Sequence, residues 1–543
     1  MIDLEDDRFG SSGFADYAMR KRAGLYRKQG AYVGTDDAGR HCHSDQQSAI
    51  ALVGGARSGK GNFIISWLVD GCLTERGEAQ HIISLDWKNQ NGPIAAQQVR
   101  QGRQIYAYNP RRHPNAPYSR MNPHSHLTPD SPTLVADAQL DSASWIPFTD
   151  PRAQFFEAMA QKVNTAAQVT MARLDGVVTL PTLADKMAGF GGVTEEWLAF
   201  EYEIGQQPEP EIRKVASDLQ RLRESNSDSG GWEGIKSQLQ IPYAALADPQ
   251  VRAALSPPYD FDFSWLTDDD APPAMVSIAE DLEYAEIASP ILRTLLTSAF
   301  IRKRRAPTAR AQFWNLDEAP AMGAWPLGVK LATIGAGYLI RAAYVSQSSR
   351  QLDALGPHAG EIITNSCGTA IYLGVRSSQQ ASLLTTQLGK VTLEYDDRAR
   401  QEAARAASSK ALLDMALNGA DSVTSLMTAA HQDRMAEHRS KMARDLRSVD
   451  EVINEKNDRA YVFMPGVLER PFYANVPKYW QRRDLAGRYL GDPFHAKPGT
   501  VEIATRWGQR HRKVVTADCP RHLRDWPQYR ETGRWSYVKG FKP

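Results

Sequence analysis

A glycine-rich segment in the N-terminal part of the chain has the residue types and spacing of a phosphate-binding loop. Residues 54–61 read Gly-Gly-Ala-Arg-Ser-Gly-Lys-Gly, which fits the pattern G-x-x-x-x-G-K but lacks the usual Ser or Thr at the last position. Backbone N–H groups of such a loop point at phosphate oxygens, and Lys60 would neutralise charge on the β- and γ-phosphates. The alternative is a glycine-rich turn with an exposed lysine. The predicted ATP-binding residues are Gly54, Gly55, Ala56, Arg57, Ser58, Gly59, Lys60, Gly61 and Asn62.

Two acids follow a hydrophobic run much later in the chain. Residues 312–316 read Gln-Phe-Trp-Asn-Leu and lead directly into Asp317 and Glu318. Asp317 would orient Mg²⁺ through a water molecule, and Glu318 would act as general base for the attacking water. Gln347 follows another hydrophobic run and could contact the γ-phosphate or position that water. The alternative is a strand end with two solvated acids. We therefore predict catalytic roles for Lys60, Asp317, Glu318 and Gln347, with ATP and Mg²⁺ as cofactors.

Short apolar runs directly precede the phosphate loop, Asp317 and Gln347, and strands formed by these runs would position the residues. Near-continuous apolar runs of this length are typical of parallel strands that are covered on both faces, and the phosphate loop lies between such a run and a helical stretch that begins at Asn62. This pattern predicts an α/β fold with a mostly parallel sheet and with the nucleotide at the carboxyl ends of the strands. The predicted strands cover residues 48–53, 81–86, 104–108, 274–278, 312–316, 342–345, 369–373 and 460–463.

The middle of the chain has a different character. Apolar residues recur at helical spacing between about 151 and 255, so we predict an all-helical insertion that separates Lys60 from Asp317. Residues 395–450 are rich in Ala, Arg and Glu and lack a strand pattern, which indicates solvated helices or a mobile segment. The predicted domains are an N-terminal segment (1–45), a nucleotide-binding domain in two parts (46–150 and 256–490), the all-α insertion (151–255) and a C-terminal tail (491–543).

The charge is balanced overall but not at the C-terminus. The 543 residues carry a net charge of +1, whereas residues 496–543 contain eleven Lys or Arg against four Asp or Glu. Cations that alternate with aromatic rings are typical of nucleic-acid binding, although the rings could equally pack on the rest of the protein. The chain opens on an acidic stretch and has no apolar run long enough for a membrane helix. The candidate nucleic-acid residues of the tail are Arg506, Trp507, Arg510, Arg512 and Lys513.

Taken in order, these segments resemble the coupling proteins of type IV secretion and conjugation, the TraG/TraD group. That family commonly has Arg-Ser-Gly-Lys-Gly in its phosphate loop, as in residues 57–61 here, so the missing Ser or Thr is a family trait. Further matching segments are Asp86-Trp87-Lys88, Met121-Asn122-Pro123, Leu316-Asp317-Glu318, Gly335-Ala336-Gly337, Gln347-Ser348, residues 365–375 and Gln387-Leu388-Gly389-Lys390. The resemblance runs from about residue 17 to 479.

The resemblance implies a RecA-like P-loop NTPase that assembles as a homo-hexamer around DNA. Such a protein would use ATP to deliver DNA, most simply single-stranded DNA with its relaxase, or protein cargo to a type IV secretion channel. Its partners would include membrane-bound secretion components, and the helical insertion would recognise cargo.

Two departures from the family pattern stand out. Many members carry an arginine, able to reach a neighbour's nucleotide, where this chain has Ala336; Arg341 and Arg376 are the candidate substitutes. Typical members also begin with transmembrane helices, whereas here the segment that follows the anchor starts at about residue 17. The resemblance therefore implies a soluble variant, cytoplasmic and recruited to the inner membrane through partners.

Two other functions remain open at this level. One is a different RecA-like hexameric ATPase, such as a channel-energising secretion ATPase or an FtsK/HerA-like DNA pump. The other is a non-catalytic adaptor in which nucleotide gates the binding of cargo. Lys60, Asp317 and Glu318 argue against the adaptor, and Ala336 leaves it open.

Overall fold

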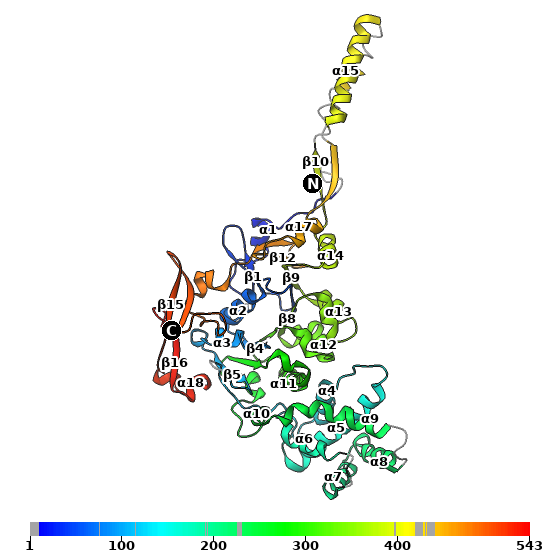
Figure 1. The fold of residues 1–543 in the computed structure, drawn as a ribbon, viewed down its shortest axis with the longest axis vertical. Helices are drawn as coiled ribbons and strands as arrows, with labels where there is room; N and C mark the ends of the chain where they lie inside the picture. The colour runs from blue at the N-terminus through cyan, green and yellow to red at the C-terminus, as the bar shows by residue number, and fades with distance from the viewer. Residues whose placement is uncertain are drawn as a thin grey trace. The chain divides into compact units, whose positions relative to one another are not determined.

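The computed structural model shows an α/β fold built on one large sheet (Figure 1). It describes residues 10–542 except 75, 114–115, 191, 193, 225–230, 396–397, 419–426, 429 and 432–439. The order of the strands in this sheet is β2-β1-β13-β12-β9-β3-β8-β7-β4-β6-β5. The strands are β1 (Ala31–Thr35), β2 (His41–Ser44), β3 (Ile50–Gly54), β4 (His81–Asp86), β5 (Gln104–Tyr108), β6 (Ala274–Ala279), β7 (Gln312–Leu316), β8 (Ile340–Ser346), β9 (Thr369–Leu373), β12 (Arg459–Phe463) and β13 (Phe472–Asn475).

Strands β9, β3, β8, β7, β4, β6 and β5 are parallel neighbours. Every residue of β3, β4 and β6 to β9 is buried, because helices or other segments cover both faces of the sheet. The predicted α/β class is therefore confirmed, and each of the eight predicted runs coincides with an observed strand. Strand β12 pairs antiparallel with β9, and β1 and β2 continue this side of the sheet with a shorter antiparallel pair.

The helix after the phosphate loop, α2 (Lys60–Asp70), anchors the loop on the sheet. Its aromatic residues are buried: the Trp67 ring lies 5.7 Å from the Phe313 ring, and the Trp67 indole N–H donates to the Tyr32 carbonyl at 2.8 Å. The helix ends at Gly71, whose φ of 81° is a left-handed conformation that glycine adopts without strain. The helix therefore begins at Lys60, two residues before the predicted start at Asn62.

The helical region lies between β5 and β6 in the sequence and gathers at the lower end of the view (Figure 1). The helical region begins earlier than predicted, with α4. This helix was not predicted because buried polar side chains interrupt its helical spacing of apolar residues. Asp137 and Asp141 of α4 are buried and pair with Arg304 and His124 from other elements. The helices are α4 (Leu134–Trp145), α5 (Gln154–Asp175), α6 (Leu180–Ala188), α7 (Glu195–Gly205), α8 (Pro210–Glu224), α9 (Gly231–Gln240) and α10 (Pro249–Ala254).

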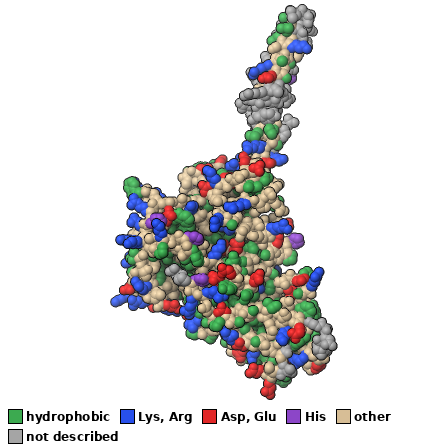
Figure 2. Space-filling view, in the orientation of Figure 1, with side chains coloured by type: hydrophobic (Ala, Val, Ile, Leu, Met, Phe, Trp, Pro, Cys, Tyr) green, Lys and Arg blue, Asp and Glu red, His purple; other side chains and the backbone are tan. Residues whose placement is uncertain are grey.

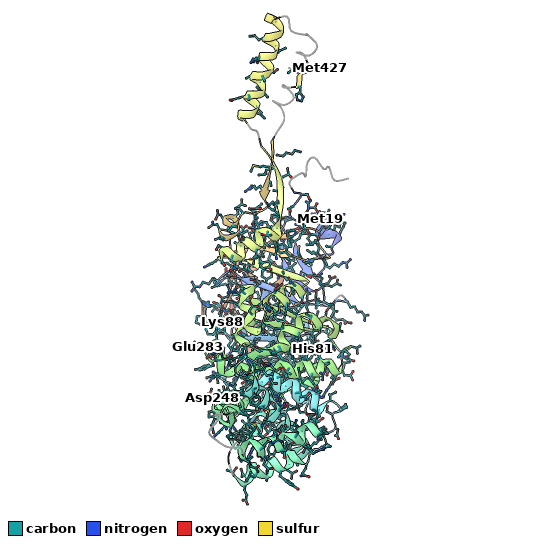
Figure 3. All side chains as sticks on the ribbon, turned by 90° about the vertical axis from the view of Figure 1, so that its right-hand side faces the viewer. Met19, His81, Lys88, Asp248, Glu283 and Met427 are labelled. Carbon is teal, nitrogen blue, oxygen red and sulfur yellow. The ribbon has the colours of Figure 1, made fainter. Side chains whose placement is uncertain are left out.

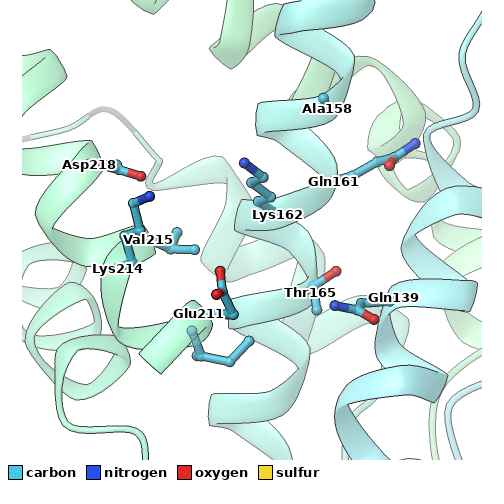
Figure 4. A pocket seen from close by; sticks show the side chains of 10 residues that line it. Gln139, Ala158, Gln161, Lys162, Thr165, Glu211, Lys214, Val215 and Asp218 are labelled. Atoms are coloured by element: carbon cyan, nitrogen blue, oxygen red, sulfur yellow. The ribbon is translucent and has the colours of Figure 1, made fainter. Parts of the chain in front are cut away.

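A cavity of about 490 Å³ opens between α4, α5 and α8 of this region (Figure 4). Charged groups of both signs line it: Lys162 from α5, and Glu211, Lys214 and Asp218 from α8. Further α-helices outside this region are α1 (Tyr17–Arg22), α3 (Asn91–Ile94), α11 (Ala285–Arg305), α12 (Pro326–Ile334), α13 (Ala359–Ser366) and α18 (Pro527–Arg530).

Residues Val375–Lys456 belong to a second compact unit, together with the N-terminal segment up to Asp16 and Glu469–Phe472. The predicted helical character holds for α15 (Arg398–Asn418). A strand, β11 (Ser440–Asp445), was not predicted there; it lacks a strand-like sequence and is extended because it pairs antiparallel with β10 (Lys390–Tyr395). The unit also contains α14 (Ser378–Leu388) and α17 (Val449–Ile453). Much of the predicted segment, residues 419–426, 429 and 432–439, lies outside the described residues.

The C-terminal segment has a sheet of its own, formed by β14 (Thr500–Thr505), β15 (Gly508–Asp518) and β16 (Arg534–Val538). Cys519, Leu523, Tyr529 and Trp535 pack together as a small core beside it. Helix α18 contacts β5, at the edge of the large sheet. Throughout the described part of the chain, we find no helix with the length and apolar character needed to cross a bilayer.

A buried cation joins the helical region to the loop that follows β7. Arg293 of α11 is 4% exposed, and its guanidinium donates to the Ser144 carbonyl at 2.6 Å and to the Met322 carbonyl at 2.6 Å. Burial lowers the pKa of Arg293 to about 9. The first carbonyl belongs to the last turn of α4, and the second lies just after Asp317 and Glu318. Arg293 therefore ties the helical region to the segment that carries both acids.

Substituting Arg293→Met should destabilise the protein by about 3 kcal/mol, because it leaves buried carbonyls without donors. We expect this as a lower thermal midpoint in calorimetry. The matched control is Arg221→Met, at a side chain that is 73% exposed, which should leave the midpoint nearly unchanged. Equal midpoints for the two variants would show that the Arg293 contacts do not hold the regions together.

Candidate nucleotide-binding site

The sheet order brings four strand ends together. Strands β3, β8, β7 and β4 are consecutive neighbours, so the segments that follow them meet at one edge of the sheet. In Figure 3, His81 at the start of β4 lies on one side of the view, and Lys88, just after its end, lies on the other, on the same side as Glu283, which follows β6. The phosphate loop, Asp317 and Gln347 follow β3, β7 and β8. This agrees with the predicted position of the site at the carboxyl ends of the strands.

Close packing shapes the phosphate loop. A Cβ on Gly54 would lie 2.6 Å from the Ser58 hydroxyl and 2.7 Å from the Leu373 carbonyl, so only glycine fits there. Gly59 has a φ of 103°, and Arg57 has a φ of 59°, which is uncommon for a residue with a side chain. The Ser58 hydroxyl is buried without a hydrogen-bond partner among the described residues. Strain and an unused donor in one loop are typical of a binding site.

Lys60 begins α2 and points back into the loop. Its ammonium donates to the carbonyls of Gly54 at 2.6 Å and Gly55 at 3.4 Å. Burial lowers the pKa of Lys60, while the negative charges of Glu318 and Asp317 act in the opposite direction. Lys60 and Asp317, which are 257 positions apart in the sequence, line the same cavity and so share one site.

The two acids after β7 have different surroundings. Burial raises the pKa of Asp317 to about 6, and the charges of Asp86 and Glu318 add to this shift. Glu318 has a left-handed backbone with a φ of 44°, and its carboxylate accepts a hydrogen bond of 2.9 Å from the Gln347 side chain. Lys60, Asp317, Glu318 and Gln347, the four residues with predicted catalytic roles, line one cavity in the structure.

The segment after β4 supports Asp317. The Asn91 amide donates to the Asp317 carboxylate at 2.9 Å. The buried Asp86 carboxylate shapes this segment, because it accepts from the backbone N–H groups of Gln90 at 3.2 Å and Gly92 at 2.8 Å. Sequence analysis had noted Asp86 and Lys88 only as a family-like segment and had missed Asn91. A polar cluster just after a predicted strand was the available indication.

These residues line a cavity of about 680 Å³, a size typical of ligand sites. Its wall contains the predicted loop residues from Gly55 to Asn62, together with Lys88, Gln90, Asn91, Asp317, Glu318 and Gln347. Sequence analysis missed a second group, which comes from the C-terminal part of the chain. This group consists of Lys478, Tyr479, Trp480, Asp492 and His495.

The arrangement fits a nucleoside triphosphate with a divalent cation. The loop N–H groups and Lys60 suit phosphate oxygens, and Asp86, Asp317 and Glu318 form a negative cluster that a cation would relieve. Gly61 has open space where a side chain would start, so room exists at the position where other loops carry Ser or Thr. Asp317, which lines the cavity, is the carboxylate predicted to orient Mg²⁺ through a water molecule.

The sequence matches a family model described as type IV secretory system conjugative DNA transfer over residues 5–415. The chain belongs to this family. The resemblance to the coupling-protein group is thereby confirmed. A search of the curated proteins found no match.

Solved structures of a conjugative coupling protein have a fold similar to that of this chain. TrwBdeltaN70 in complex with sulphate has a TM-score of 0.57 at 14% identity, covering 86% of this chain and 93% of that chain. TrwB with the GTP analogue GDPNP has a TM-score of 0.57 at 13% identity, covering 89% and 99%. TrwB with ADP and Mg²⁺ has a TM-score of 0.56 at 14% identity, covering 86% and 94%. The predicted RecA-like P-loop fold with its added helical region is confirmed.

The candidates for the family's trans-acting arginine have different environments. Arg341 on β8 is 2% exposed, and its guanidinium donates to the Ser44 carbonyl at 2.7 Å and the Ser44 hydroxyl at 3.1 Å. Burial lowers the pKa of Arg341 to about 10. A side chain held in this way is not at the surface, so the structure gives no support to the role predicted for Arg341. Ala336 and Arg376 are exposed, and Arg376 belongs to the second compact unit.

The candidate nucleic-acid residues are on the C-terminal sheet. Trp507 is 76% exposed at the β14–β15 turn, and the Arg506 guanidinium lies 5.6 Å from its ring centre. Arg510 and Arg512 are two residues apart on β15, so their side chains leave one face of the strand, and the Lys513 side chain leaves the other face. Figure 2 shows Lys and Arg side chains gathered at the left edge, where β15 lies. Tyr529 and Trp535 are buried instead, which agrees with the alternative that part of the rings pack internally.

The raised pKa of Asp317 predicts a stability effect that depends on pH. Because its carboxyl holds a proton more tightly in the folded than in the unfolded protein, stability falls as pH rises through about 4 to 6. Asp317→Asn removes the charge, so it should raise the thermal midpoint at pH 7.5 and change it little near pH 4. Asp185→Asn, at a side chain that is 62% exposed, is the control. A lower midpoint for Asp317→Asn at pH 7.5 would contradict the electrostatic account.

Proposed function

We propose that this chain is an ATP-hydrolysing coupling protein that drives DNA, or protein cargo, toward a type IV secretion channel. The observation that carries the proposal is the meeting of Lys60, Asp317, Glu318 and Gln347 around one cavity in a member of the conjugative DNA transfer family. Support for the cofactors comes from TrwB, which has a similar fold and has been solved with ADP and Mg²⁺ and with an ATP analogue.

The residues suggest a division of labour in hydrolysis. Lys60 and the loop N–H groups bind the β- and γ-phosphates, and bound Mg²⁺ supplies further charge neutralisation. Glu318 takes the proton from the water that attacks the γ-phosphorus, while the bond to the β–γ bridging oxygen breaks and ADP leaves with phosphate. Gln347 donates to Glu318 and so holds this carboxylate in position. Asn91 does the same for Asp317.

The wider assembly follows from the family. DNA with its relaxase, membrane-bound secretion components and a homo-hexameric ring are the partners we propose. The helical region, with its charged cavity between α5 and α8, is the part proposed to recognise cargo (Figure 4). A DNA pump of another RecA-like group and a nucleotide-gated adaptor are the alternatives, and measured turnover separates the adaptor from the two motors.

Two substitutions test the motor. Lys60→Ala should abolish ATP hydrolysis, because the cation that binds the β- and γ-phosphates is lost. Glu318→Gln should bind ATP as the unmodified chain does and lower turnover by about 100-fold or more, because the amide cannot accept the proton. Phosphate release, with and without single-stranded DNA, is the measurement. Hydrolysis by Glu318→Gln at the unmodified rate would remove Glu318 as the base.

The C-terminal cations can be tested without removing the segment, whose deletion would also remove part of the cavity wall. Arg510→Glu combined with Arg512→Glu should weaken single-stranded DNA binding and reduce the salt slope of log Kd by about 1.4, which is the value for two phosphate contacts. Lys513→Glu tests the other face of β15.

Reversing Arg221, an exposed cation of the helical region, is the matched control. Fluorescence anisotropy at several salt concentrations gives both affinity and slope. An unchanged affinity and slope in the Arg510 and Arg512 double variant would reject this face as a DNA site.

A further inference from the structure

A second cavity adjoins the one at the phosphate loop. Its volume is about 340 Å³, and four residues line both cavities: Tyr479, Trp480, Asp492 and His495. The remaining wall is built from the C-terminal segment alone, with Tyr489 from the loop before β14, Thr500 and Glu502 from β14, and His511 from β15. This wall lies beyond residue 415, where the match to the family model ends.

The shared wall lies beside the first turn of α2. The Asn62 side-chain oxygen accepts from the Tyr479 backbone N–H at 3.2 Å. Asn62 follows Lys60 by two residues, whereas Glu318 and Gln347, the partners proposed for the γ-phosphate and its water, follow the ends of β7 and β8. If the γ-phosphate of a bound nucleotide lies near Glu318, its nucleoside end would extend in the other direction, along α2 toward Tyr479 and Trp480.

Aromatic rings make up the centre of the shared wall. The Tyr479 ring lies 4.8 Å from the Trp480 ring and 5.0 Å from the Tyr489 ring, nearly perpendicular to both. The Tyr489 hydroxyl donates to the Glu502 carbonyl at 2.7 Å, which fixes this ring on β14. Ring faces of this kind stack on nucleobases and accept any base, because every base has a π-face.

Polar contacts hold the far side of the shared wall against the nucleotide-binding fold. The Asp492 carboxylate accepts from the Gln90 amide at 2.6 Å and lies 3.2 Å from the His495 ring nitrogen. Arg482 is almost fully buried and bridges Asp70 at the end of α2, at 3.0 Å, and Asp484, at 2.6 Å. The C-terminal wall is therefore attached to both α2 and the segment after β4.

We infer that this second cavity receives the nucleoside part of the nucleotide, with the base stacked on the Tyr479–Trp480 wall. The inference rests on the proposed function, because it presupposes that the phosphate loop binds a nucleoside triphosphate. It makes the C-terminal segment a part of the nucleotide site. Since stacking does not distinguish bases, ATP and GTP should bind with similar affinity.

The test compares ligands with and without a nucleoside, using the full chain and isothermal titration calorimetry with Mg²⁺. Trp480→Ala should weaken the binding of ATP and GTP by about 5- to 100-fold, the range found for loss of one base stack, and leave inorganic triphosphate binding unchanged. Trp480→Phe should restore most of the affinity. Phe494→Ala is the control, because Phe494 is 60% exposed in the same segment and is not part of either cavity wall.

The outcomes separate this inference from the proposed function. Equal ATP affinity in Trp480→Ala and the unmodified chain, with Lys60→Ala still defective, would overturn the inference and leave the phosphate site in place. An equal loss for ATP and inorganic triphosphate in Trp480→Ala would also overturn it, because the wall would then support the phosphate loop. Failure of the unmodified chain to bind any of these ligands would overturn the proposed function, and the inference with it.

Discussion

The concentration of negative charge around Asp317 is the constraint on which the site depends. Burial raises the pKa of Asp317 to about 6, and the negative charges of Asp86 and Glu318 add to this shift. The fold tolerates the charge because Lys60 is within electrostatic reach and Asn91 donates to Asp317. A perturbed carboxyl such as Asp317 that lines a cavity is typical of functional sites, so a locally destabilising charge is consistent with a functional one.

Two buried arginines, Arg293 and Arg482, connect segments near the site to parts of the chain that are distant in sequence. Arg293 connects the last turn of α4 to the loop after Glu318, because its guanidinium donates to a carbonyl oxygen in each. Arg482 joins the end of α2 to the C-terminal segment through Asp70 and Asp484. Both guanidiniums are buried, where hydrogen bonds are strong and unmade ones are costly. Each guanidinium therefore connects segments that are distant in sequence, α4 to the loop after β7 and α2 to the segment around Asp484.

Sequence analysis predicted the sheet better than the site. The strands of the parallel core were recognisable because burial on both faces demands uninterrupted apolar runs, as in residues 81–86. Helix α4 and strand β11 were not predicted because neither has a clear apolar pattern. Helix α4 buries paired aspartates, and β11 is extended only because β10 pairs with it. Arg341 was a candidate for the trans-acting arginine in the sequence, but it is buried and its guanidinium donates to Ser44 of β2.

By itself, the sequence determined the phosphate loop, the acids after β7, the parallel strands and the family, because each depends on a local pattern of residue types. Only the tertiary structure decided that Asn91 supports Asp317 and that Tyr479 and Trp480 wall the cavity. The physical reason is that these contacts depend on strand order and on where a segment some 400 residues after the phosphate loop packs. Neither the spacing nor the type of a residue records which distant segment it will meet when the chain folds.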